Sequence, residues 1–120
     1  NMKKNEFIQY VGSSEQIDKE IRKITSDDSI LIDLTGDKEL EKLYKYYFNI
    51  NVLKDNIEKL LLAIFKNNII KKIIINDGHL LNLKTIELLD NLYQMKNIDI
   101  ILFSTFKSTN NNILFKERFL

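Results

Sequence analysis

The strongest chemical signal in the chain is an apolar run that ends in polar residues, Ile73-Ile74-Ile75-Asn76-Asp77. Folds that hydrolyse nucleotides place a magnesium-organising Asp and a general-base carboxylate at the end of such a strand. Asn76 carries no charge and would hold Mg²⁺ weakly, whereas Asp77 is a candidate general base or water-positioning residue. A cap on the following helix explains Asp77 equally well. His79 is more typical of a loop histidine than of a catalytic one.

Three other polar segments also follow apolar runs: Gly12-Ser13-Ser14, Asp33 to Asp37, and Ser104-Thr105. Ligands of an open parallel sheet bind outside the carboxyl ends of its strands. By this rule the candidate ligand-binding residues are Gly12, Ser13, Ser14, Asp77, Ser104 and Thr105. Turns between strands and helices also favour Gly, Ser, Asp and Asn, so turn chemistry is the alternative explanation for each segment.

The segment Gly12-Ser13-Ser14 lacks the features of a P-loop. That loop needs the spacing G-x-x-x-x-G-K-[ST], but no second glycine follows here and the first lysine is Lys19. Glu15 and Asp18 also place negative charge in the first turn of the predicted helix, where they would repel a triphosphate. We therefore expect no working triphosphate cradle at this turn.

Short apolar runs alternate with longer segments of helical periodicity along the chain. Four runs predict strands, at residues 7–11, 30–34, 72–75 and 98–103. Four segments predict helices. The first is capped by Ser13, with Gln16 at capping-box spacing, and the second follows the Thr35–Asp37 turn and carries Leu40 to Tyr47. The third runs from Leu53 to Phe65 and the fourth from Leu83 to Lys96. The apolar tail 113–120 is expected to dock as a strand or a short helix.

This alternation, with three strands apolar on both faces, is typical of a parallel sheet covered by helices. The predicted fold is α/β: a three-layer sandwich with a mainly parallel sheet of about four strands. The length of 120 residues indicates one domain, 1–120.

The composition argues against several classes of function. The chain has no cysteine and one histidine, so thiolate zinc sites are excluded and we expect no metal site. The net charge of +1 provides no field to attract nucleic acid or an acidic membrane. No apolar run approaches the roughly 20 residues of a membrane span, and no apolar signal core follows Met2. We expect a cytoplasmic protein, and its Lys-, Ile- and Asn-rich composition is typical of a low-GC bacterium.

The segment from Lys72 to Leu120 resembles the thymidine kinase family of the P-loop superfamily. That family has a strand ending in Asp-Glu-Ala-Gln-Phe, a helix, a strand leading to a Tyr-Gly-Leu-Arg-Thr-Asp-Phe loop, and a Glu-Leu-Phe segment. The corresponding blocks here are Ile73–Leu80, Ile86–Tyr93, Ile98–Lys107 and Asn112–Phe115. Similar blocks occur in ATPase modules of the clamp-loader or initiator type, so the resemblance is firmer for the superfamily than for thymidine kinases.

The resemblance implies a degenerate site. The family's magnesium Asp corresponds to Asn76, its catalytic Glu to Asp77, and its loop arginine to Phe106 or Lys107. The P-loop glycines, lysine and threonine have no counterparts after Gly12, and neither the zinc ribbon nor the nucleoside-gripping lasso is present. The resemblance also implies a strand order: the first predicted strand beside the fourth, then the third, then the second.

We therefore expect a non-catalytic, nucleotide-binding-like domain that acts by binding or as a regulatory or assembly subunit, with a nucleotide as its candidate ligand. The alternative is a protein-interaction module without a small ligand, with candidate surfaces at the aromatic residues Tyr44, Tyr46, Tyr47 and Phe48 and at the tail residues Phe115, Phe119 and Leu120. We expect self-association through an exposed sheet edge or this tail. An active hydrolase that uses Asp77 with His79 is the third reading, and we expect no enzymatic activity.

Overall fold

The computed structural model describes residues 4–36, 38–109 and 114–120. Its strands are β1 (Phe7–Val11), β2 (Ser29–Asp33), β3 (Tyr46–Asn49), β4 (Lys72–Asn76), β5 (Asp99–Ser104) and β6 (Lys116–Phe119). Its helices are α1 (Ser14–Ile24), α2 (Ile57–Phe65) and α3 (Leu83–Met95), with the 3₁₀ turns η1 (Lys38–Leu43) and η2 (Gly78–Leu80). Asp37 and Ile113, which the sequence places in a turn and in the tail, lie outside the described residues.

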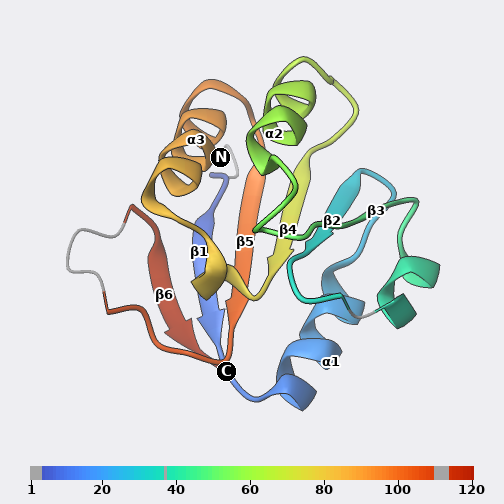
Figure 1. The fold of residues 1–120 in the computed structure, drawn as a ribbon, viewed down its shortest axis with the longest axis vertical. Helices are drawn as coiled ribbons and strands as arrows, with labels where there is room; N and C mark the ends of the chain where they lie inside the picture. The colour runs from blue at the N-terminus through green and yellow to red at the C-terminus, as the bar shows by residue number, and fades with distance from the viewer. Residues whose placement is uncertain (1–3, 37, 110–113) are drawn as a thin grey trace.

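The six strands form one sheet in the order β3-β2-β4-β5-β1-β6, and each neighbouring pair is parallel (Figure 1). The four strands predicted from the sequence lie in the predicted order, because β1, β5, β4 and β2 are successive neighbours. The expected number of about four strands is too low. One extra strand, β3, lies beside β2, and the tail provides the other, β6, beside β1.

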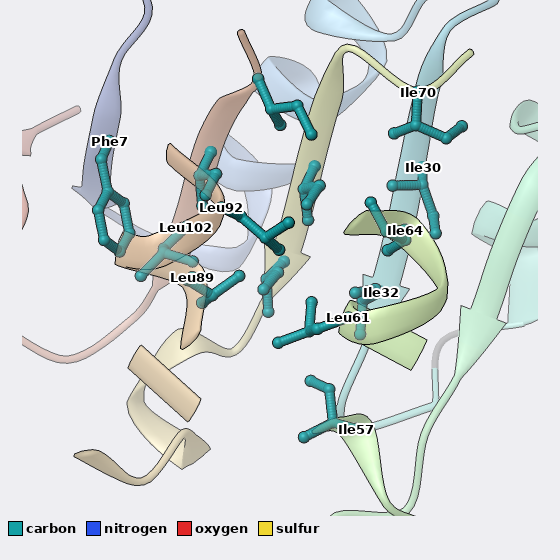
Figure 2. Packing of buried hydrophobic residues seen from close by; sticks show 14 of the residues in the cluster. Phe7, Ile30, Ile32, Ile57, Leu61, Ile64, Ile70, Leu89, Leu92 and Leu102 are labelled. Carbon is teal, nitrogen blue, oxygen red and sulfur yellow. The ribbon is translucent and has the colours of Figure 1, made fainter. Parts of the chain in front are cut away.

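The central strands are apolar because side chains pack on both of their faces. Ile73 and Ile75 of β4 belong to a cluster with residues of α2 and α3, whereas Ile74 belongs to a cluster with residues of α1 and η1. Figure 2 shows the first cluster, where Leu61 of α2 and Leu89 of α3 lie close to side chains of the sheet. This packing explains the uninterrupted isoleucine run in β4.

The helix predicted over Leu40 to Tyr47 is wrong. Residues Lys38–Leu43 form a 3₁₀ turn, and Tyr46–Asn49 form the edge strand β3, which pairs with β2. Aromatic side chains favour strands, and pairing with β2 satisfies the backbone groups on the side of this segment that faces β2. Adjacent residues of a strand point to opposite faces of the sheet, and Tyr46 and Tyr47 accordingly pack against different hydrophobic clusters. The aromatic side chains therefore do not share one face, as the predicted helix would require.

The predicted start of the next helix at Leu53 is also wrong. Leu53 is 93% exposed, and α2 begins only at Ile57. The residue before it, Asn56, caps the helix: its side-chain oxygen accepts a hydrogen bond from the backbone N–H of Glu58 at 3.0 Å. An Asn in this position is a favourable helix cap. None of the described helices is long and apolar enough to cross a membrane.

The capping box predicted for the first helix is confirmed. Ser13 Oγ accepts a hydrogen bond from the backbone N–H of Gln16 at 3.1 Å, and Gln16 Oε1 accepts one from the backbone N–H of Ser13 at 2.8 Å. These two bonds satisfy two of the N–H groups that the first turn of α1 leaves without helical partners.

Tyr44→Phe is expected to lower the free energy of unfolding by about 1–2 kcal/mol, since the buried Tyr44 hydroxyl donates to the backbone carbonyl of Ile21 at 2.9 Å. Chemical denaturation measures this change. Tyr46→Phe, at a half-buried position, is the control and should change stability by less than about 0.5 kcal/mol. Equal losses in the two variants would contradict the role of the Tyr44 hydroxyl.

The same hydroxyl predicts a loss of stability in alkali. Burial raises the pKa of Tyr44 to about 12 from 10.0, against smaller opposing effects of Thr25 and Arg22. Above pH 10 the unfolded chain loses this proton while the folded protein keeps it, so this contribution to stability falls as the pH rises to about 12. Chemical denaturation across this pH range should show that the free energy of unfolding falls less steeply with pH in Tyr44→Phe than in the natural sequence. An identical fall in both proteins would refute the role of the Tyr44 hydroxyl in this pH dependence.

Candidate functional site

Polar side chains of β2 and β4 meet at the carboxyl ends of these adjacent strands. Asp33, fully buried at the end of β2, accepts hydrogen bonds from the backbone N–H of Thr35 at 3.2 Å and from the Tyr47 hydroxyl at 3.2 Å. The Thr35 hydroxyl donates to Asp77, which follows β4. The cluster therefore joins two carboxylates through Thr35, and one Asp77 carboxylate oxygen is engaged by the protein itself.

Asp77 has the only left-handed backbone conformation among the described residues other than glycine, with φ 62° and ψ 45°. Its backbone N–H donates to Asn76 Oδ1 at 3.1 Å. Asp and Asn tolerate this conformation better than other L-residues do, because their short polar side chains bond locally. Asp77 precedes η2 but makes no side-chain cap bond to it, so helix capping does not account for its carboxylate.

A second polar group lies at the end of β5. Ser104 is fully buried, and its hydroxyl donates to the carbonyl of Phe106 at 2.9 Å while accepting from the backbone N–H of Phe106 at 2.9 Å. His79 Nδ1 lies 3.1 Å from the same Ser104 oxygen. The His79 ring also packs edge-on against Phe106, with the ring centroids 4.7 Å apart. This contact anchors η2 to the loop that follows β5.

The turn between β1 and α1 is closed by side chains of the chain itself. The backbone N–H of Gly12 donates to the carbonyl of Ser104 at 3.2 Å, and the N–H of Leu120 donates to the carbonyl of Val11 at 2.8 Å. A Cβ added at Gly12 would lie 2.8 Å from Gln16 Oε1 and 3.0 Å from Leu120 Cβ. Close packing therefore favours glycine here, because a larger residue would push against Gln16 and Leu120.

The predicted site residues fall into separate environments. Gly12 is bonded to the Ser104 backbone, and Ser13 is engaged in the capping box. Asp77 is held by Thr35, toward β2, whereas the Ser104 hydroxyl is held by Phe106 and His79. Ser14 and Thr105 are exposed.

Sequence reasoning missed one buried polar residue, Gln9, which is 3% exposed in the middle of β1. A polar residue inside the apolar run Phe7–Val11 was the signal that could have identified it. Gln9 lines a cavity of about 210 Å³ near the carboxyl ends of β4 and β5, together with His79 and Phe106. In the described part of the chain, His, Asp and Glu side chains form no group of three or more that could hold a metal ion.

No protein-family model, curated protein or solved structure matches the chain.

Asp77→Asn is expected to keep the free energy of unfolding within about 0.5 kcal/mol of the natural value, because Asn tolerates the left-handed conformation and its Oδ1 accepts the Thr35 bond. Asp77→Ala is expected to lower it by about 1–2 kcal/mol, since Ala disfavours this conformation. Urea denaturation of both variants tests the pair. A loss in Asp77→Asn as large as that in Asp77→Ala would show that the negative charge is what matters.

Proposed function

We propose that the chain is a P-loop-like domain that has lost nucleotide hydrolysis and acts by binding, as a regulatory or assembly subunit. The strand order supports the kinship, because β1 lies beside β5, β5 beside β4 and β4 beside β2. The core supports a three-layer arrangement, since α2 and α3 contribute to one apolar cluster and α1 and η1 to the other.

The observation that carries the loss of hydrolysis is the closed turn between β1 and α1. In a P-loop fold this turn wraps the phosphates with backbone N–H groups. Here the N–H groups of Gly12, Ser13 and Gln16 are already bonded within the protein, and Leu120 packs against Gly12. A triphosphate would have to break the capping box and displace Leu120 while facing the negative charge of Glu15 in the first turn.

The end of β4 also supports a non-catalytic domain. Asn76 supplies no negative charge to organise Mg²⁺. The carboxylate of Asp77 is engaged by the Thr35 hydroxyl. A general base must reach the attacking water with a free carboxylate oxygen in the right direction, and this bond holds Asp77 toward β2.

The first test measures phosphate release from ATP, GTP and dTTP, with and without Mg²⁺, together with the shift in melting temperature that each causes. We expect no phosphate release and no shift that depends on Mg²⁺, because the cradle and the metal-organising charge are both missing. Phosphate release that requires Mg²⁺ and disappears in Asp77→Asn would overturn the proposal.

The edge strand β3 favours protein binding as the mode of action. It is the last strand on its side of the sheet, and Tyr46–Asn49 contains no charged residue. Phe48, within this strand, is 38% exposed. An uncharged edge strand presents free backbone groups to another strand. At the other edge, β6 has charged residues at Lys116, Glu117 and Arg118, and charges on an edge oppose such pairing.

We expect the protein to self-associate through β3, and light scattering at increasing protein concentration measures this. Phe48→Lys should shift the equilibrium toward monomer by placing a charge on this edge. Phe119→Lys, which adds the same charge to β6, is the matched control and should leave self-association unchanged. A monomeric natural protein at high concentration, or equal effects of both substitutions, would refute self-association through β3.

A further inference from the structure

The free edge of β3 presents the backbone groups of alternate residues (Figure 1). At the end of the β2–β3 ladder, the backbone N–H of Ile50 donates to the carbonyl of Asp33 at 2.9 Å. Successive residues of a strand direct their backbone groups to opposite sides, so the even-numbered residues of β3 also face β2. The N–H and C=O groups of Tyr47 and Asn49 therefore point away from the sheet, where a further strand can pair with them.

The side chains on one face of β3 form an aromatic surface. Tyr46 and Phe48 are two residues apart and lie on the same face of the sheet. Together with Leu60, Ala63 and Ile64 of α2, they contribute to a pocket of about 230 Å³. Tyr46 is half-buried and Phe48 is exposed, so apolar surface remains open at this edge. A strand added to β3 covers this surface best if its own apolar side chains occupy alternate positions.

The strand β3 of a second copy has this composition. Antiparallel pairing about a two-fold axis at Tyr47 lets the two Tyr47 residues exchange both of their backbone hydrogen bonds. In the same arrangement, Tyr46 of each copy lies directly opposite Phe48 of the other. Residues paired in this way, without hydrogen bonds between them, have their Cα atoms about 4.5 Å apart, and aromatic side chains at such positions attract each other.

Other registers satisfy the two strands less well. With the axis at Phe48, only one aromatic pair remains, and Tyr46 lies opposite Ile50, which is buried within its own chain. A shift by one residue brings the outward backbone groups of one copy against groups that already bond to β2. In the register with two aromatic pairs, Lys45 lies opposite Asn49, so no like charges face each other.

We propose that β3 binds β3 of a second copy in antiparallel orientation, with the two-fold axis at Tyr47, so that Phe48 of each copy packs over Tyr46 and the pocket of the other. This inference rests on the proposed self-association through β3 and specifies its orientation and register. The pairing joins the two sheets into one and occupies the free β3 edge of both copies. Because charged residues oppose pairing at β6, the assembly ends at the dimer.

The test is disulfide crosslinking, since the chain contains no cysteine and disulfides form only between introduced residues. Tyr46→Cys and Phe48→Cys are oxidised separately and as an equal mixture. In the mixed dimer the two cysteines lie opposite each other, within the roughly 4.4–6.8 Å between Cα atoms that a disulfide spans. One natural pair of Tyr46 with Phe48 remains in that dimer. In a dimer of either variant with itself the cysteines lie diagonally, about 7–8 Å apart.

We expect at least about tenfold more disulfide-linked dimer in the mixture than in either variant alone, because Cα atoms more than about 7 Å apart cannot be bridged without backbone movement. The matched control mixes Phe48→Cys with Gln94→Cys, on the exposed surface of α3, and should give no more dimer than Phe48→Cys alone. If Tyr46→Cys fails to fold, the exposed pair Lys45→Cys and Asn49→Cys, opposite each other in the same register, takes its place.

Two results overturn the arrangement while leaving association through β3 intact. One is as much dimer from Phe48→Cys alone as from the mixture, which places the axis at Phe48. The other is no crosslink in the mixture although the natural protein self-associates and Phe48→Lys weakens that association. A monomeric natural protein overturns both the arrangement and self-association, and is the outcome if β3 instead accepts a strand of a different protein. None of these results bears on phosphate release, which tests the loss of hydrolysis separately.

Discussion

Burial of the central strands on both faces constrains where polar chemistry occurs in this molecule. Ile73, Ile74 and Ile75 are completely shielded from water, with β2 and β5 on either side and apolar clusters above and below. A polar side chain in such a strand would need a buried partner. Along β4, polar groups are therefore confined to the ends of the strand, where the chain turns and backbone and side-chain groups can be satisfied together.

The strands β1, β2, β4 and β5 could be predicted from their local apolar pattern in the sequence. Their order in the sheet, β1 beside β5, then β4, then β2, could be predicted as well. The edge strand β3 could not, because Tyr44, Tyr47 and Phe48 are spaced as on one helical face. Pairing with β2, which no local window contains, decides in favour of a strand. The tail was expected to dock, but its choice between strand and helix depends on the free edge of β1, which is also distant in sequence.

The same distinction applies to the candidate site. The position of Asp77 at the end of β4 follows from the hydrophobic run before it. Its bond to Thr35 does not, because that bond exists only when β2 and β4 are neighbours. The orientation of the Gln9 side chain also depends on the fold, since its amide donates to Glu117, which is far away along the chain. Residue types near strand ends indicate where a site can form, and the pairing of strands decides which groups are already occupied.

The placement of β1 between β5 and β6 has a consequence for how the chain reaches its fold. Phe7 pairs with Ile100, and Ile8 with Lys116, so both neighbours of β1 are made of residues from the opposite end of the sequence. During synthesis, β1 leaves the ribosome long before either neighbour exists. Contacts between such distant segments form slowly because a long loop must close first. Until then the apolar strand β1 has no partner strand, and it is the segment for which a chaperone that shields exposed strands would matter most.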